Sequence, residues 1–420
     1  MIGFYPLRAS VSAMDVVSLL IPAAFAFLAG ILLLGYLVVH PLRMSSYLAM
    51  TCVMVFATGV AVSLIFWRDW TGGATAVGLC VVASLGGYVV MASRVLAADE
   101  KRVLPTILRK KGDPGLGHTA VVYFTHGESP TYTPINWIRQ FREFDEQKKP
   151  FMPWLLRPLF LYNLRQRYLR IGKSDHYTLH ALRLREIEQE YRRRGDDSTR
   201  FYLSFHDYNP RPDAAAIQAL NDGASRIIVA EVFVTQSNHT VEGEKMVEAL
   251  HPEEYGASVA FTKPLWDSKT MHRMFVERAE AAIGDTPREK VGVLLVGHGQ
   301  PDEWDKEFAT ETQQEKAFKE AIMRALGEAG YRAENLAVAW MEFKEPKPAP
   351  KIKELVANGV EKILFYSACI SADTVHSQCD VPDLVFAANV PEGISLINMG
   401  AWDNSSQTIR AITERIDAVK

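Results

Sequence analysis

Three long apolar segments in the first hundred residues constrain this 420-residue chain more than any other feature. They are Val16–Val39, Met44–Trp67 and Thr71–Ser93, and none of them contains an ionisable side chain of Asp, Glu, Lys, Arg or His. A helix needs about 20 apolar residues to cross a hydrocarbon core of about 30 Å. The first segment is too long for a signal peptide, whose apolar region has roughly 7–15 residues. The alternative is that these segments are helices buried in a protein core, but three such segments in succession argue against it. The sequence predicts a membrane anchor of three transmembrane helices in residues 1–112.

Basic residues are distributed unevenly around these segments. Arg43 lies in the first connection, and a cluster of Lys and Arg from Lys101 to Lys111 follows the third segment. Cytoplasmic loops carry an excess of Lys and Arg. We therefore predict a multi-pass protein of the cell inner membrane, with the lipid bilayer as a partner and the C-terminal body in the cytoplasm. Overall, 46 basic and 49 acidic residues give a net charge of −3, which argues against nucleic acid as a partner.

Beyond a linker at Asp113–Gly117, short apolar runs alternate with amphipathic helical patterns. The expected strands are Ala120–Phe124, Arg226–Val234, Val291–Val296, Leu336–Met341 and Lys362–Tyr366. Alternation of strand and helix is typical of α/β proteins with parallel sheets flanked by helices.

An internal repeat divides this body. Asn209–Val229 and Glu345–Phe365 share a P-x-P, a Gly and a following strand. Each is preceded by a strand that ends in His-Gly and is followed by a second His. The repeat predicts two similar lobes, residues 118–285 and 286–420, of which the first carries an insertion after its His-Gly.

Histidines stand where the strands of both lobes end: His126 and His239 in the first, His298 and His376 in the second. Glu342 follows a strand of the second lobe, and we expect His206 at the comparable place of the first. Ligands of open parallel sheets bind beyond the carboxyl ends of the strands. Two imidazoles and a carboxylate suit a divalent metal ion and proton removal near neutral pH. A single His of this kind is more often a loop or capping residue; the repetition favours a site.

The body resembles the class II tetrapyrrole chelatases, the family of protoporphyrin ferrochelatase and sirohydrochlorin cobaltochelatase. Val293–Pro301 (VLLVGHGQP) looks like their metal-site strand end, and Ala372–Pro382 (ADTVHSQCDVP) like the cobaltochelatase loop. Arg167–Gly172 (RYLRIG) and Asp207–Thr240 look like the ferrochelatase signature around the porphyrin. The resemblance covers about residues 118–400 and implies a chelatase-like fold of two lobes.

The resemblance also implies roles for particular residues. It makes His298, Glu342 and His376 the catalytic and metal-binding set, with His126 and His239 as further metal ligands. His376 stands where ferrochelatase has a Glu, so the residues do not fix the identity of the metal ion. Fe²⁺ is the first choice, and Co²⁺ and Ni²⁺ are the alternatives. The insertion Trp137–Arg170 combines apolar and basic residues, as a porphyrin wall would; an amphipathic helix at the membrane or in the core is an equal alternative. The predicted tetrapyrrole contacts there are Arg157, Arg165, Arg167 and Tyr168.

These expectations amount to a lyase of haem biosynthesis that inserts a divalent metal ion into a tetrapyrrole. We expect no tightly bound cofactor, since the metal is a substrate. No G-x-x-x-x-G-K-[ST] loop occurs in the sequence, which argues against an ATP-driven chelatase. The alternatives are a non-catalytic haem or metal chaperone or sensor on the same fold, and a receptor with a periplasmic-binding-like architecture, which would need the body outside.

Overall fold

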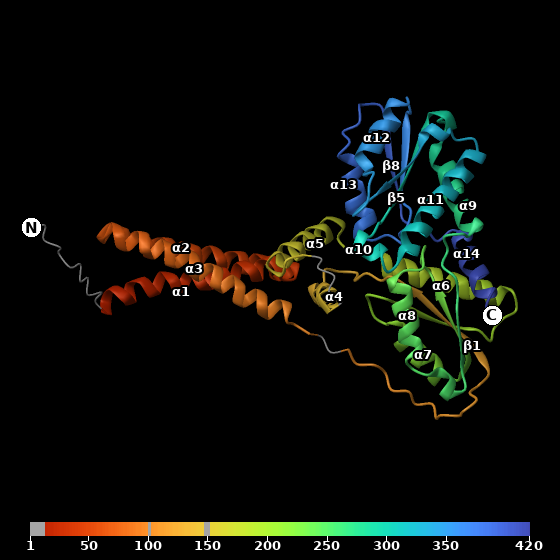
Figure 1. Ribbon diagram of the computed structural model, residues 1–420, viewed down its shortest axis with the longest axis horizontal. Coiled ribbons are helices and arrows are strands. Elements are labelled where there is room, and N and C mark those ends of the chain that lie inside the picture. Colours follow the sequence, from red (N-terminus) through yellow and green to blue (C-terminus); the bar gives the residue numbers. More distant parts are fainter. Residues whose placement is uncertain (1–12, 100–101, 147–151) are drawn as a thin grey trace, which may run out of the picture. The chain divides into compact units, whose positions relative to one another are not determined.

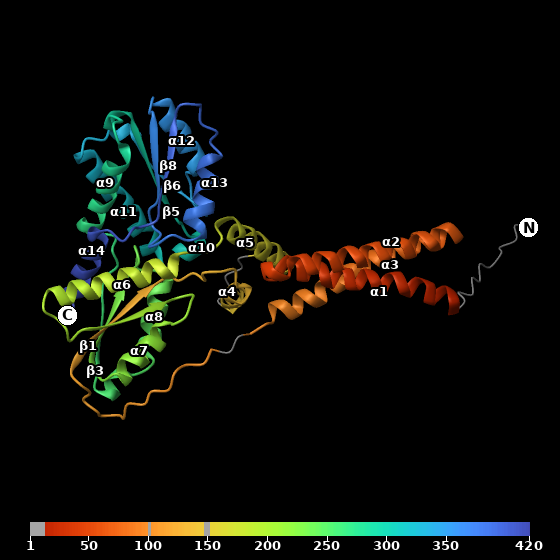
Figure 2. The same ribbon diagram turned by 180° about the vertical axis from the view of Figure 1, so that it is seen from behind.

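The computed structural model describes residues 13–99, 102–146 and 152–420, and its chain divides into two compact units. The first unit contains α1 (Ala13–Val38), α2 (Met44–Arg68) and α3 (Trp70–Leu96) together with residues 132–169. The three helices lie side by side in Figures 1 and 2. By length and composition each can cross a membrane. This matches the predicted anchor and indicates membrane association.

The insertion between the first strand and the next long helix folds onto this anchor. It forms α4 (Pro134–Glu146) and α5 (Arg157–Ile171), which share one buried cluster with α1 and α3. Ile138, Phe141 and Leu161 of the insertion pack there with Leu34 of α1 and Ala92 of α3. Burial of these apolar side chains explains why the insertion groups with the anchor.

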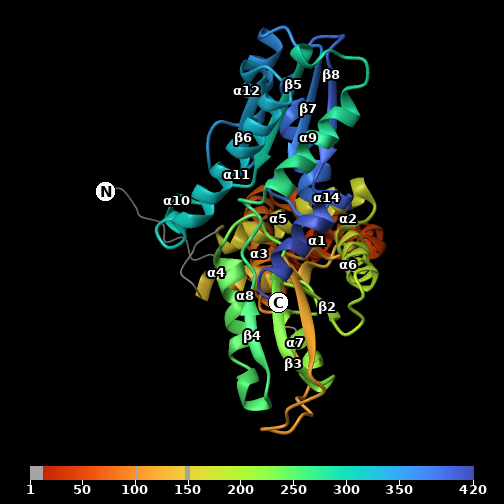
Figure 3. The ribbon, with the colours of Figure 1, turned by 90° about the vertical axis from the view of Figure 1, so that its right-hand side faces the viewer.

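The second unit, residues 102–131 and 170–420, contains two parallel four-stranded sheets. The first has the order β2-β1-β3-β4 and the second the order β6-β5-β7-β8 (Figure 3). The strands are β1 (His118–Thr125), β2 (Arg200–Phe205), β3 (Ala224–Glu231), β4 (Ser258–Phe261), β5 (Val291–Gly297), β6 (Leu336–Trp340), β7 (Lys362–Ser367) and β8 (Ser395–Gly400). The identical order confirms the predicted α/β class; β2, β4 and β8 were not among the expected strands.

Helices cover both faces of the sheets. They are α6 (His176–Arg193), α7 (Pro212–Asn221), α8 (Asn238–Glu248), α9 (Lys269–Ile283), α10 (Asp302–Asp305), α11 (Ala309–Glu328), α12 (Pro348–Ala357), α13 (Val381–Phe386) and α14 (Ser406–Asp417). Single 3₁₀ turns occur at Pro41–Arg43, Trp154–Leu156, Pro252–Tyr255, Arg288–Lys290 and Ala333–Asn335, and a π-helical turn at His376–Asp380. The C-terminal helix returns to the first lobe, where Tyr191 donates to Asp417 at 2.5 Å.

The two lobes of the second unit meet at the carboxyl ends of their strands. Thr125 ends β1, and its hydroxyl lies 3.0 Å from that of Ser371, in the loop after β7. One hydrophobic cluster runs from β1 and β3 through α9 into β5 and β7. This shared core brings the loops of both lobes, with their histidines, to the same junction.

Candidate functional site

Both His-Gly motifs need glycine for their backbone. Gly127 has φ +101° and Gly299 has φ +80°, the left-handed region that disfavours side chains. A Cβ on Gly127 would lie 2.7 Å from Cβ of Phe205, and one on Gly299 would lie 2.6 Å from the Glu342 carbonyl oxygen. The motif therefore lets the neighbouring strand pass close to each histidine.

Main-chain hydrogen bonds give the true equivalence of the two lobes. The Asp207 N–H donates to the His126 carbonyl at 2.8 Å, and the Glu342 N–H donates to the His298 carbonyl at 3.1 Å. The expectation that His206 matches Glu342 is therefore wrong by one residue. The loop after β6 has one residue more than the loop after β2, a difference that alignment on the P-x-P hides. Each lobe thus has a carboxylate after its second strand.

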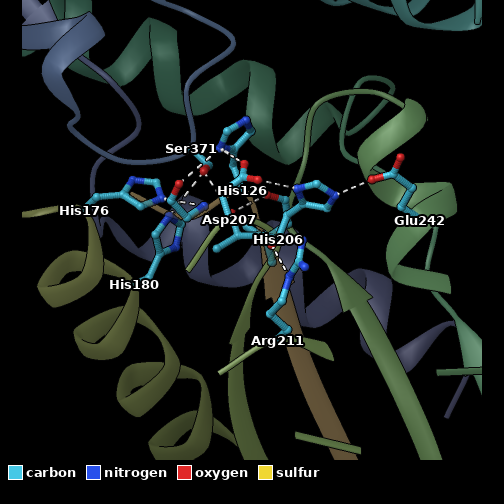
Figure 4. A network of polar contacts seen from close by, with 11 residues as sticks. His126, His176, His180, His206, Asp207, Arg211, Glu242 and Ser371 are labelled. Carbon is cyan, nitrogen blue, oxygen red and sulfur yellow. Dashed lines mark hydrogen bonds and ion pairs between the residues drawn. The ribbon is translucent and has the colours of Figure 1, made fainter. Parts of the chain in front are cut away.

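The first-lobe cluster consists of His126, His206, Asp207, His239 and Glu242, of which all but His239 are labelled in Figure 4. His206 Nδ1 lies 2.9 Å from Asp207 Oδ1, and its Nε2 lies 2.8 Å from Glu242 Oε2. The ring centroids of His206 and His239 are 4.4 Å apart, and His126 Nδ1 lies 3.2 Å from Asp207 Oδ2. Ligand atoms of His206, His239 and Glu242 all lie within 4.8 Å of one another, so these three can hold a metal ion.

Helix α8 delivers two members of this cluster. The main-chain N–H of Ser237 donates to Thr240 Oγ1 at 2.9 Å, which fixes the first turn. His239 and Glu242 are three residues apart in that turn and therefore share a face. The sequence showed His239 by its place in the repeat, whereas Glu242 was missed. The i,i+3 spacing to His239 was the available signal.

The charges of the first-lobe cluster are strongly coupled. Burial disfavours a charged His206, but Asp207 and Glu242 outweigh it and raise the pKa of His206 to about 9. Burial and the neighbouring imidazoles His206 and His126 instead hold the pKa of His239 well below its usual value. The pKa of Glu242 falls to about 2 despite its burial, because His206 donates to it. The site thus keeps a neutral His239 and an ionised Glu242, as metal binding requires, whereas His206 is protonated in the metal-free site and must lose its proton to bind a metal ion.

In the second lobe, His298 and His376 face each other with ring centroids 5.7 Å apart. His376 Nδ1 lies 2.7 Å from Asp380 Oδ2, one π-helical turn away, so Nε2 is left for a ligand. Burial opposes protonation, but Asp380, Glu342 and Glu128 together raise the pKa of His376. His298 and His376 of the predicted set are therefore brought together, and Glu342 is near enough to affect His376 electrostatically; the role of the three as one metal site stays a prediction. Asp380 is a partner that the sequence analysis missed.

A buried glutamate holds the His-Gly loop of the second lobe. Glu315 of α11 accepts the N–H of His298 at 2.6 Å and that of Gly299 at 3.4 Å. One turn later the Lys319 ammonium lies 3.1 Å from the ring centroid of Trp340. In the first lobe His176 of α6 takes the comparable place, where its Nε2 accepts from the Gly127 N–H at 3.3 Å.

The first lobe also supports the loop that carries His376. Both carboxylate oxygens of Glu128 lie 3.2 Å from the N–H of Val375. Arg183 of α6 donates to the Ser371 carbonyl at 2.8 Å, and His180 Nε2 lies 3.2 Å from the Ser371 hydroxyl (Figure 4). Burial raises the pKa of Glu128 to about 7. Glu128, His180 and Arg183 of the first lobe therefore contact the loop that carries His376 in the second lobe.

The side chains predicted to contact a tetrapyrrole lie on α5, in the first unit. Arg157 pairs with Asp145, Arg165 is fully buried and donates to the Val39 carbonyl at 2.9 Å, and the buried Tyr168 packs on Tyr132. Arg167 is partly buried on the same helix. Binding of propionates by the first two would break these contacts, and the role of all four stays a prediction.

Comparison with known proteins gives a partial match, and no family model matches the chain. Over 109 residues the chain is 31% identical to the sirohydrochlorin cobaltochelatase of Methanothermobacter thermautotrophicus, covering 25% of this chain and 65% of that protein, just under two thirds of its length. SirB of Bacillus subtilis with Fe³⁺ is 14% identical with a TM-score of 0.45, and the sirohydrochlorin chelatase SirB from Bacillus subtilis subspecies spizizenii in complex with cobalt is 12% identical with a TM-score of 0.41. Each of these two structural alignments covers 71% of this chain and 94% of the SirB chain. The sequence match and the paired parallel sheets support a class II chelatase-like fold, as the resemblance predicted.

Proposed function

We propose that this protein is a membrane-anchored chelatase that inserts a divalent metal ion into a tetrapyrrole without ATP. Fe²⁺ is the first choice of metal, with Co²⁺ and Ni²⁺ as alternatives. The observation that carries the proposal is the gathering of histidines and carboxylates where the strands of both lobes end: three possible metal ligands in the first lobe, and His298 beside His376 in the second. The similarity to a protein named for cobalt insertion into sirohydrochlorin supports the reaction class.

Insertion exchanges two pyrrole N–H protons for one M²⁺, so the site needs both ligands and bases. In the second lobe, His298 Nδ1 lies 2.7 Å from the Gly299 carbonyl, which it can donate to while Nε2 accepts the two pyrrole protons in turn, releasing the first to water before it takes the second. Glu342 and His376 would hold the metal ion on its way into the ring, and Asp380 would orient His376. Bending of the macrocycle by binding at its rim exposes the nitrogen lone pairs, at a cost of about 1–5 kcal/mol.

The first-lobe cluster is the rival place for insertion. The ligand atoms of its His206, His239 and Glu242 lie within 4.8 Å of one another, whereas the second lobe has the pair His298 and His376, with Glu342 close enough to affect His376 electrostatically. We assign insertion to the second lobe and metal holding to His206, His239 and Glu242 of the first. On this assignment a metal ion passes across the junction between the lobes.

The anchor would hold this chemistry at the cytoplasmic face of the inner membrane. Three helices that are long and apolar enough to span support the tether, and the Lys and Arg cluster after the third supports the orientation. A reporter fused after Lys420 that is active outside the inner membrane would overturn it.

A non-catalytic haem or metal carrier on the same fold is the second candidate. It is favoured by the placement of Arg157 and Arg165, because Arg157 is paired with Asp145 and Arg165 is fully buried, so neither presents an accessible guanidinium to a propionate. Turnover separates the two candidates, because a carrier binds metal and macrocycle in fixed stoichiometry and releases no metallated product.

The test is an absorbance assay of the full chain in detergent. Protoporphyrin and sirohydrochlorin are each combined with Fe²⁺, Co²⁺, Ni²⁺ and Zn²⁺, and the spectral change is followed over many equivalents of macrocycle. We expect multiple turnovers with at least one pair, and their loss in a double variant, His298→Ala with His376→Ala. Binding without turnover in all pairs would replace the chelatase by the carrier.

A further inference from the structure

Four large apolar side chains stand exposed at the start of α5. Trp154, Leu155, Leu156 and Leu159 are 41%, 43%, 47% and 45% exposed. They come from the 3₁₀ turn Trp154–Leu156 and the first turn of the helix, and we call them the α5 patch. Exposed apolar groups that gather in one place mark an interaction surface.

The position of the α5 patch is fixed by a contact with the anchor. The hydroxyl of Tyr88 donates to the carbonyl of Leu155 at 2.9 Å. Tyr88 belongs to α3, whose candidate span runs from Trp70 to Leu96. Eight residues separate Tyr88 from the end of that span, so the contact lies about 12 Å back from the helix end at 1.5 Å per residue. Amphipathic segments at a bilayer surface bury their apolar face about 5–10 Å deep.

The insertion is also held at the ends of two anchor helices, whose last carbonyls lack partners within the helix. Tyr132 donates to the Val38 carbonyl at 2.9 Å and Arg165 to that of Val39 at 2.9 Å. Arg142 of α4 donates to the carbonyl of Ala98 at 2.6 Å, just beyond α3. These contacts dock the insertion where α1 and α3 end.

The charge beside the α5 patch is compensated. Arg157 has its side chain only 8% exposed, pairs with Asp145 at 2.5 Å and lies 5.1 Å from the ring centroid of Phe141. Asp145 is 51% exposed, but Arg157 is buried and paired, so no unpaired charge of Arg157 lies among the exposed apolar side chains of this turn.

We propose that the α5 patch is embedded in the interfacial layer of the bilayer, on the side where α1 and α3 end. The occupant is lipid, because Leu155 of the patch is hydrogen-bonded to Tyr88, which lies inside the candidate span of α3. The inference rests on the proposed membrane anchoring, and it adds a second, non-spanning contact with the bilayer to the three spans.

Quenching of Trp154 by brominated lipid tests the proposal. The full chain and its Trp154→Phe variant are placed in nanodiscs at one chain per disc, with phosphatidylcholine brominated near the top of its acyl chains or unmodified. The difference between the two proteins reports Trp154 alone. We expect it to be blue-shifted and to lose at least half of its intensity in brominated lipid. Trp304→Phe, in the second unit, is the matched control and should report a tryptophan that lipid does not quench.

The possible results distinguish a failure of the proposed embedding of the α5 patch from a failure of the membrane anchor. If the exposed Trp67 and Trp70 of the anchor are quenched and Trp154 is not, the embedding is wrong and the anchor stands. If no tryptophan of the chain is quenched, the anchor itself is wrong. Quenching of Trp154 that appears at one chain per disc but vanishes at several would mean that a second copy covers the patch, which also overturns the proposal.

Discussion

Removal of the Glu315 carboxylate should destabilise the second unit by several kcal/mol. Glu315 is 3% exposed and accepts the N–H groups of His298 and Gly299. Lys319 beside it is 1% exposed, and its ammonium makes no hydrogen bond to any residue that the structure describes. Burial lowers the pKa of Lys319, and Glu315 opposes that shift. Loss of one partner of a buried charge pair costs about 3–5 kcal/mol.

The assay is thermal unfolding of the full chain in detergent. At about 2–4 °C per kcal/mol, Glu315→Ala should lower the midpoint of the second unit by roughly 6–20 °C. Adding Lys319→Met should recover at least half of the loss, because it removes the stranded ammonium. Lys319→Met alone should cost far less, since Glu315 keeps its two main-chain donors. A midpoint for Glu315→Ala within 2 °C of wild type, or no recovery in the double variant, would refute the reasoning.

Three further predictions follow from other sites. His206→Ala with Glu242→Gln should lower the number of Co²⁺ ions bound per chain by one in equilibrium dialysis, and an unchanged stoichiometry would remove the first-lobe metal site. Burial and Glu244 raise the pKa of the buried Glu231 to about 9, so the unfolded state ionises first and stability falls as pH rises from about 5 to 9. Glu231→Gln should flatten this fall in denaturant melts at several pH values, and a parallel decline in both proteins would contradict it. Arg165→Met should free the insertion from the end of α1 and speed its proteolysis several-fold, with cleavage at the wild-type rate as the contrary result.

Long-range repetition made most of the fold accessible from sequence. The P-x-P, Gly and strand landmarks recur in order, and both sheets have the same strand order. The edge strands β4 and β8 were missed because their half-buried residues give no strong apolar run, as Ser258–Phe261 illustrates. Strand β2 was missed although the P-x-P follows it closely, because Arg200 and Ser204 interrupt its short apolar run.

The candidate site was accessible only in part. His126, His239, His298 and His376 could be named because each follows a strand of the repeat. The equivalence of Asp207 and Glu342 could not be predicted, because the loops before the two P-x-P motifs differ by one residue. Only the main-chain hydrogen bonds reveal this difference. The contacts of the α5 arginines could not be predicted either. Arginines interleaved with apolar residues can bind a ligand's carboxylates or donate to the last carbonyls of a helix, and the sequence pattern is the same in both cases.

The most direct test of the account compares His298→Ala and His239→Ala in single-turnover metal insertion. Tetrapyrrole binding by each variant is measured in parallel from the absorbance shift of the macrocycle, so that loss of chemistry is distinguished from loss of binding. The account predicts that His298→Ala binds the tetrapyrrole but inserts no metal, while His239→Ala keeps most of the insertion rate at saturating metal. An inactive His239→Ala beside an active His298→Ala would contradict it and move the reaction to the first lobe.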